Sequence, residues 1–283
     1  MKTVLYNGLI VTTTDGHLIT GHSQCINLRH YSTTPYISRA ISSDIKSDEQ
    51  FNWRLAGLFD SDGYGDKYEA SITLHVTEVN LAYILQERFG GVVIFIEDKA
   101  AVRWRVTRAQ ELEGVALCLN GKTFLKEDVM AIWADRFSFT ILPTPNKISL
   151  DNPYISGLAE GDGTTTVKST DLQPAFSVSN KNEYLLTLVL SAFGCGHVYP
   201  DRSWAGFKFY ASSIHDLGII GAYFAKYPLL SDKQLEFALF FSLIQLKKDG
   251  YHLKRDFAGL VASAEKRQHF YNRLAEYNRI KKY

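Results

Sequence analysis

The alternation of hydrophobic and polar positions predicts the same order of elements twice along the chain. In the first half, a helical pattern at residues 55–62 precedes a strand-like stretch at 68–76 and a second helical pattern at 79–91. Alternating stretches at 92–98 and 101–107 follow, and two more helices complete the unit. Each unit is therefore expected to run helix, strand, strand, helix, strand, strand, helix, helix.

The second half repeats this order one hundred residues later. A helical pattern at 155–162 precedes an alternating stretch at 174–180 and a further helical pattern at 181–196. Strand patterns at 197–201 and 206–212 come next, again followed by helices. The same order of elements is improbable twice by chance. We therefore expect a duplicated domain whose halves are related by a pseudo-twofold axis.

The boundaries of the two repeats follow from shifts in composition. We place the first repeat at residues 47–140 and the second at 154–283, joined by a polar, proline-containing linker at 141–153. Residues 1–46 are acid-poor and rich in Ser and Thr, which is typical of a loosely packed leader or arm, or of a targeting segment. The pattern of residues 252–283 predicts one or two amphipathic basic helices. Their basic side chains are expected first to form a solvated helix face, and contact with phosphates is the secondary interpretation.

Composition and charge narrow the class of protein. The chain has 283 residues, 46% of them apolar, so it can bury one large core or two smaller ones. Its formal net charge is +1, so any basic surface must be local. The three cysteines have no metal-like spacing, which argues against a disulfide scaffold and indicates a reducing compartment. No apolar run is long enough to span a bilayer, and we expect a soluble protein.

One phrase appears in both repeats, as LAGLFDSDG at 55–63 and ISGLAEGDG at 155–163. The small residues at its second and third positions allow two helices to approach closely. This packing would bring Asp62 and Asp162 together at two helix C-termini, where each raises the pKa of the other unless a cation intervenes. One isolated Asp-Gly after a helix is an ordinary turn signal, but two copies in register favour a site. Carboxylate oxygens suit Mg²⁺, and paired ions support phosphodiester hydrolysis.

The two phrases resemble the signature motifs of the LAGLIDADG homing endonucleases, in the single-chain form with two motifs. The resemblance covers about residues 52–272 and includes the order of elements. It implies an α+β fold of two tandem αββαββα repeats related by a pseudo-twofold, with the motif helices at the interface and antiparallel sheets forming a DNA-binding saddle. It also implies an intron-encoded monomer in a mitochondrion or chloroplast.

The resemblance assigns the metal site to the ends of the two motifs. Asp62 and Asp162 would be the metal-binding acids, and the backbone carbonyls of Ser61 and Gly161 would be lesser contacts. The implied cofactor is Mg²⁺, as two or three divalent ions. Mn²⁺ is expected to substitute, and Ca²⁺ is expected to bind without supporting cleavage.

The family also places a basic residue near the scissile phosphates, at the start of the helix after each repeat's sheet. In the second repeat the stretch SDKQ supplies Lys233. In the first repeat the wording departs from the family, and we choose Lys126, with Lys122 as the fallback. An ordinary surface lysine is the alternative for each.

Alternation in the strands predicts which side chains face DNA. In AVRWRVT the arginines lie opposite the tryptophan, and in GFKFYAS the lysine and tyrosine lie opposite the phenylalanines. Aligning the repeats matches Arg103 with Lys208 and Arg105 with Tyr210. The side chains expected on the polar faces are Arg103, Arg105, Lys208, Tyr210, Thr164, Thr166 and Lys168. Such a face can read a major groove, but a solvated antiparallel sheet shows the same alternation, so only the resemblance favours DNA.

The first hairpin of the first repeat is expected to be stunted. Only fifteen residues separate Gly63 from the helix expected at Val79, which is short for two strands and a turn. We expect a smaller DNA contact on that side.

The sequence as a whole predicts a Mg²⁺-dependent, site-specific endonuclease. It would cut both strands of a long asymmetric double-stranded DNA target, with each aspartate serving one strand. Two alternatives stay open: an intron RNA maturase or splicing cofactor that uses the same saddle, and a catalytically weakened DNA-binding relative. The expected partner is double-stranded DNA, with the chain's own intron RNA as the alternative, and neither a membrane nor an obligate protein partner is expected.

Overall fold

The computed structural model describes residues 2–6, 9–13, 48–254 and 263–281. The chain divides into two units, Met1–Ser42 and Ser43–Tyr283. In the first unit, β1 (Lys2–Tyr6) pairs with β2 (Leu9–Thr13) in an antiparallel hairpin. The rest of the leader or arm expected over residues 1–46 lies outside the described residues, so its role stays a prediction.

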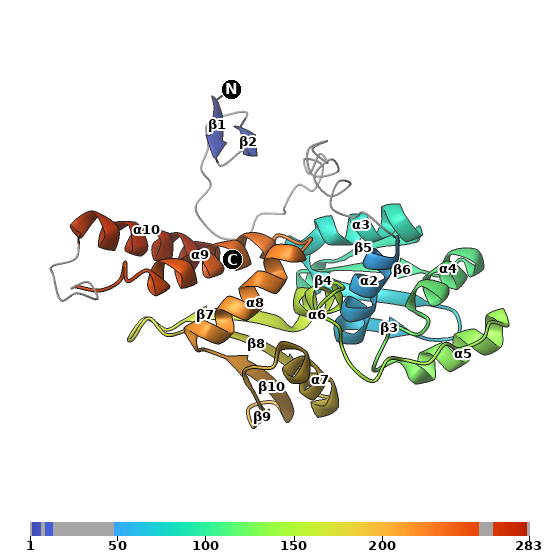
Figure 1. Ribbon diagram of the computed structural model, residues 1–283. Coiled ribbons are helices and arrows are strands. Elements are labelled where there is room, and N and C mark those ends of the chain that lie inside the picture. The colour runs from blue at the N-terminus through green and yellow to red at the C-terminus, as the bar shows by residue number, and fades with distance from the viewer. Residues whose placement is uncertain (1, 7–8, 14–47, 255–262, 282–283) are drawn as a thin grey trace. The chain divides into compact units, whose positions relative to one another are not determined.

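The second unit contains both repeats, and their elements follow the predicted order (Figure 1). The first repeat consists of α2 (Asp48–Asp62), β3 (Gly63–Gly65), β4 (Ala70–His75), α3 (Val79–Phe89), β5 (Val92–Ile96), β6 (Ala101–Val106), α4 (Ala109–Leu119) and α5 (Glu127–Phe137). The second consists of α6 (Tyr154–Asp162), β7 (Gly163–Val167), β8 (Pro174–Asn180), α7 (Glu183–Phe193), β9 (His197–Asp201), β10 (Gly206–Ala211), α8 (Ile214–Lys226) and α9 (Lys233–Lys248). Short 3₁₀ turns at Val76–Glu78 and Glu97–Lys99 flank α3 and β6.

Each repeat folds its strands into one four-stranded antiparallel sheet. The strand orders are β3-β4-β6-β5 and β7-β8-β10-β9, so the two sheets have the same topology. Their registers also match, because Gly63 pairs with Ile72 and Gly163 pairs with Val178 at corresponding positions. The predicted α+β fold of two tandem repeats is therefore confirmed.

The alternation of β6 and β10 separates a buried face from an open one. In β6, Val102, Trp104 and Val106 are fully buried, and the arginines between them lie on the other face. In the second sheet, the ring of Phe176 contacts the rings of Phe209 and Phe224, with centroids 6.3 and 5.4 Å apart. Helices cover the buried faces, because apolar side chains of the strands can leave water only there.

The motif helices α2 and α6 lie side by side at the junction of the repeats (Figure 1). A Cβ atom at Gly57 would lie 1.9 Å from the carbonyl oxygen of Tyr154, and one at Gly157 would lie 1.9 Å from the carbonyl oxygen of Arg54. No residue but glycine fits such an approach of two backbones. The reciprocal contacts are those expected for a pseudo-twofold axis between the helices.

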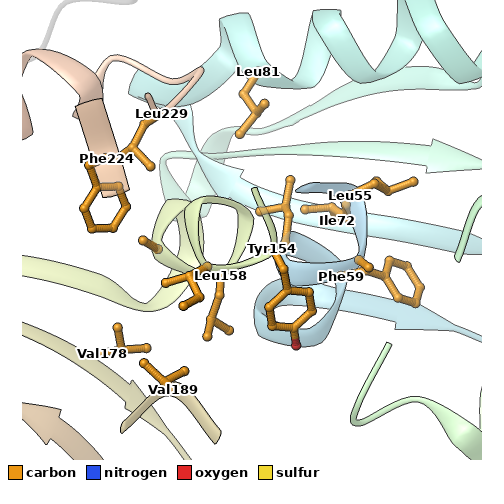
Figure 2. Packing of buried hydrophobic residues seen from close by; sticks show 14 of the residues in the cluster. Leu55, Phe59, Ile72, Leu81, Tyr154, Leu158, Val178, Val189, Phe224 and Leu229 are labelled. Atoms are coloured by element: carbon orange, nitrogen blue, oxygen red, sulfur yellow. The ribbon is translucent and has the colours of Figure 1, made fainter. Parts of the chain in front are cut away.

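Each motif helix also supplies large side chains to the core of its own repeat. In Figure 2, Leu55 and Phe59 of α2 point toward the first sheet, whereas Leu158 of α6 points toward Val178 and Val189 of the second repeat. The small residues of α2 and α6 therefore form the contact between the two helices, and their large residues pack against the sheets.

The first hairpin is shorter than its counterpart, as the spacing predicts. Strand β3 pairs with β4 over three positions, whereas β7 pairs with β8 over five. The open face of the first sheet is correspondingly smaller at this end.

The linker and the C-terminal segment both pack on neighbouring helices. Asn120, at the end of α4, donates to the carbonyl of Thr140 and accepts from the amide of Leu142, at 2.9 Å each. Helix α10 (Ala264–Ile280) packs on α9 and buries Phe270 and Tyr277. It is one helix of the predicted basic C-terminal segment, and residues 255–262 lie outside the described residues. No helix in the described part of the chain is long and apolar enough to cross a bilayer.

Candidate active site at the ends of the motif helices

The carboxylates of Asp62 and Asp162 come together where the two motif helices end. Asp62 is the last residue of α2 and Asp162 is the last residue of α6. A Cβ atom at Gly161 would lie 2.0 Å from Asp62 Oδ2 and 2.5 Å from Ser61 Oγ, so the two phrases meet at these positions. Asp162 accepts a hydrogen bond of 2.8 Å from the side-chain amide of Asn180, at the end of β8.

Burial is the main influence on both acids. It raises the pKa of Asp162 to about 6, and the negative charge of Asp62 adds to this effect. Burial likewise raises the pKa of Asp62 above its ordinary value. The repulsion that the sequence predicted therefore contributes to the pKa of Asp162, but desolvation contributes more. Desolvation is the largest influence on the pKa of both aspartates.

Two lysines approach the aspartates from the helices that follow. Lys126, immediately before α5, donates to the carbonyl of Gly63 at 2.6 Å. Lys233, the first residue of α9, donates to the carbonyl of Glu160 at 2.6 Å and lies 3.5 Å from the carbonyl of Gly161. Each ammonium group therefore sits at the negative end of its own motif helix. Both lysines lower the pKa of both aspartates, so the four groups form one electrostatic cluster.

Lys122 lies elsewhere. Its ammonium group is 3.6 Å from Glu49 Oε2 and 5.8 Å from the ring centroid of Trp53, at the beginning of α2. The structure therefore places Lys126 beside the aspartates and leaves the fallback residue outside the cluster.

The acids two residues before each aspartate brace the loops that carry the lysines. Asp60 is 2% exposed and accepts from the amides of Phe124 and Leu125, at 2.7 and 3.2 Å, and from the hydroxyl of Tyr154 at 2.6 Å. Because Tyr154 belongs to α6, this last bond crosses between the repeats. Burial raises the pKa of Asp60 to about 6, against the opposing effect of these donors.

Glu160 plays the same part in the second repeat. It is 1% exposed and accepts from the amide of Leu230 and the hydroxyl of Ser231, at 2.5 Å each. The sequence analysis did not identify this role of Asp60 and Glu160. The available signal was that both repeats carry an acid at the same place in the phrase.

A third acid of the first repeat belongs to the same electrostatic cluster. Burial raises the pKa of Glu78 to about 7, the charge of Lys233 opposes this, and the charges of Glu160 and Asp62 reinforce it. Glu78 ends the turn before α3 and accepts from the amide of His75 at 3.2 Å. The matching position before α7 holds Asn182, so the two halves of the site are not equivalent.

The donor set suits a hard divalent cation that keeps much of its water. Within the described ranges, no group of three or more His, Cys, Asp and Glu side chains could hold a metal alone. Two carboxylates and nearby backbone carbonyls remain as protein ligands, all of them oxygen. Mg²⁺ is commonly bound in this way, through one or two carboxylates plus waters and substrate phosphates. The residues present therefore fit the implied ion.

The open sheet faces carry the side chains that alternation predicts. Strand pairing places Arg103 and Lys208 at matched positions, and also Arg105 and Tyr210, which confirms the alignment of the repeats. On β7, Thr164 and Thr166 are exposed. Lys168 is exposed just beyond the end of that strand.

Two acids on these faces were missed in the sequence. Arg105 pairs with Glu69 at 2.6 Å, and Lys208 pairs with Asp201 at 2.9 Å. The Nε of Arg103 donates to the Thr73 hydroxyl at 3.0 Å. The three cations are therefore held in place on the sheet, and part of their charge is neutralised within the protein.

Comparisons with known proteins agree with this geometry. The family described as LAGLIDADG endonuclease matches residues 155–244, which contain the second motif, and the first repeat carries the same motif and elements. The second repeat therefore matches the LAGLIDADG endonuclease family directly, and the first repeat resembles it in its motif and in its order of elements.

Its relatives include intron proteins of different kinds. An uncharacterized cox1 intron-2 protein of Schizosaccharomyces pombe is 26% identical over 245 residues, covering 80% of this chain and 76% of that protein. The intron-encoded RNA maturase bI4 of Saccharomyces cerevisiae is 26% identical over 198 residues, or 65% of this chain and 29% of that protein. The intron-encoded DNA endonuclease ai2b of Dictyostelium discoideum is 24% identical, with 64% and 73% covered.

Solved structures share the fold at low sequence identity. I-SmaMI, bound to an uncleaved DNA target in the presence of calcium ions, is 15% identical, with a TM-score of 0.57. The alignment covers 78% of this chain and 97% of I-SmaMI. I-GzeII in complex with its DNA target gives the same TM-score and identity, covering 78% of this chain and 96% of I-GzeII.

Proposed function

We propose that this protein is a site-specific DNA endonuclease that cuts both strands of a long asymmetric target, using divalent metal ions held by Asp62 and Asp162. One observation carries the proposal: two aspartates and two lysines from separate repeats converge at the ends of the paired helices. A purely structural helix interface does not need two carboxylates and two ammonium groups at the same end.

In this mechanism the side chains have distinct tasks. Asp62 and Asp162 hold the ions, and the carbonyls of Ser61 and Gly161 add weaker ligands. Bound Mg²⁺ would supply charge stabilisation to the attacking and leaving oxygens of the phosphodiester. Lys126 and Lys233 stabilise the negative charge that develops on each scissile phosphate. Each aspartate serves one strand.

The open faces of the two sheets form the DNA-binding saddle of this proposal. Arg103, Arg105 and Lys208 provide donors suited to guanine edges and phosphates, and hydroxyl groups line β7. The faces differ in size and in side chains, which supports an asymmetric target. Because one chain supplies both aspartates, a monomer suffices. An intron-encoded origin and an organellar location belong to the same proposal.

The second candidate is an intron RNA maturase, which the similarity to bI4 favours. The two functions differ in their need for the aspartates, because RNA binding on a saddle requires no metal-dependent cleavage. The convergence of both motif acids with both lysines supports the endonuclease as the leading function.

The test is cleavage of a target obtained by selection from random duplex DNA. Asp62→Asn and Asp162→Asn should each abolish double-strand cleavage in Mg²⁺ while leaving binding in Ca²⁺ largely intact. The control is Asp135→Asn, because Asp135 is an acid on the outer surface of α5, away from the aspartate cluster. Full cleavage by the double variant would overturn the proposal, and rescue of intron splicing without any cleavage would favour the maturase.

A further inference from the structure

Two exposed apolar side chains lie on the open face of the first sheet. Val92 and Ile94 of β5 are 50% and 39% exposed. Val92 pairs with Arg105 and Ile94 pairs with Arg103, so all four side chains share one face. We call Val92 and Ile94 the apolar strip.

The core of the protein does not account for the apolar strip. The alternate residues of β5, Val93 and Phe95, point the other way and pack against the core. The strand is therefore apolar on both faces, although only one face has a core to cover. β5 is also the edge strand of its sheet, where exposed β-branched residues invite unwanted pairing with other chains. Such a strip is better explained by a partner that covers it.

The matched positions in the second repeat carry different chemistry. His197 pairs with Tyr210 and Tyr199 pairs with Lys208, so His197 corresponds to Val92 and Tyr199 corresponds to Ile94. Both replacements have a polar atom on a ring. If the fold required apolar side chains at these positions, both sheets would carry them. The difference between the two sheets instead suits a ligand whose two halves are unlike.

We propose that the apolar strip contacts thymine methyl groups in the half of the DNA target beneath the first repeat, an inference that rests on the proposed function. In the major groove the thymine methyl is the apolar group that bases present, and apolar side chains recognise it directly. The arginines beside the strip, held by Thr73 and Glu69, supply cations for the neighbouring guanines or phosphates.

The same chemistry favours DNA over RNA as the occupant. Uracil lacks the methyl group, and the major groove of an RNA duplex is too deep and narrow for side chains to read. A strip built for RNA would gain nothing from two branched aliphatic side chains at these positions.

The experiment replaces thymine by deoxyuridine, which removes only the methyl group. A target is selected in Ca²⁺ with the full-length protein, and duplexes are made with deoxyuridine in one half-site, in the other, or in neither. Substitution in one half-site should weaken binding about fourfold for each methyl group that the strip covers, or about fifteenfold for two. Substitution in the other half-site should change binding by less than about twofold.

The variant Val92→Ser/Ile94→Ser removes the methyl groups of the apolar strip and should lose this dependence on the thymine methyl group. The control Ile132→Ser, at an exposed apolar position of α5, should keep it. Thermal melting of both variants checks that the fold is retained.

The outcomes distinguish a failure of the strip inference from a failure of the proposed function. If no DNA sequence is selected, the proposed endonuclease function itself fails. If a target is selected and cut but neither half-site responds to deoxyuridine, or the serine variant still responds, the strip inference is overturned and the endonuclease stands. Equal binding of an RNA copy of the target would also overturn the inference.

Discussion

Gly161 of one motif helix lies directly against the carboxylate of Asp62 in the other. A Cβ atom at Gly161 would be 2.0 Å from Asp62 Oδ2. The two repeats therefore touch at the carboxylate that is proposed to hold the metal ion. Small changes at this position should therefore act on catalysis before they act on folding.

Gly161→Ala should displace the Asp62 side chain and slow cleavage. The atoms that meet the new methyl are the ends of the Asp62 and Ser61 side chains, which can move without unfolding the helix. A displacement of about 1 Å at a reacting centre can cost about a hundredfold in rate. We expect a loss of that order, first on one strand, measured as nicking of a supercoiled plasmid. Gly218→Ala is the control, because nothing lies within 4 Å of its Cβ position.

Gly57→Ala should instead destabilise the whole protein. Its Cβ atom would lie 1.9 Å from a backbone carbonyl oxygen, that of Tyr154, and backbone cannot move aside as a side chain can. We expect a loss of about 3 kcal/mol in the free energy of unfolding, measured by urea denaturation. Gly218→Ala in α8 should gain up to about 1 kcal/mol. Equal stability of Gly57→Ala and the unaltered protein would contradict the close helix contact.

Replacing Lys126 or Lys233 should slow DNA cleavage, whereas replacing Lys122 should not. Lys126→Ala and Lys233→Ala should each reduce the cleavage rate by about a hundredfold or more, because each removes a positive charge beside the aspartates. Lys122→Ala should cut at a nearly normal rate, since Lys122 lies beside Glu49 and Trp53. The measurement is single-turnover cleavage of saturating target. A defect in Lys122→Ala equal to that in Lys126→Ala would reverse the assignment.

Stabilisation by Ca²⁺ should depend on pH. The folded pKa of Asp162 is about 6, against 3.8 for the ordinary side chain, so the folded protein holds this proton more tightly than the unfolded chain. Without metal, this group makes the fold less stable as the pH rises from about 4 to about 6. A bound ion must displace the proton at low pH, so its affinity should be about fourfold weaker at about pH 5.5 than at about pH 7.5.

Melting temperatures with and without CaCl₂ at the two pH values measure this effect. The shift caused by Ca²⁺ should be larger at the higher pH, and Asp162→Asn should reduce the difference between the two shifts. A shift that is equal at both pH values in the unaltered protein would argue against Asp162 as a metal ligand.

The sequence by itself determined the order of elements, the duplication and the two motif aspartates. These features depend on local periodicity and on a phrase of about nine residues, both of which are visible in one chain. The faces of β6 and β10 were predictable for the same reason, because side chains alternate along a strand wherever it lies. Even the short first hairpin followed from counting the residues between Gly63 and Val79.

Only the tertiary structure decided which polar groups meet. Asp60 binds amides more than sixty residues away, Arg105 pairs with a glutamate on another strand's turn, and Lys126 rather than Lys122 reaches the aspartates. None of these partners is set by sequence spacing, because each depends on how separate elements pack. The pKa of Asp162 was also decided by the tertiary structure, because desolvation depends on how separate elements pack around a carboxylate, and it outweighs the repulsion that the paired motifs suggested.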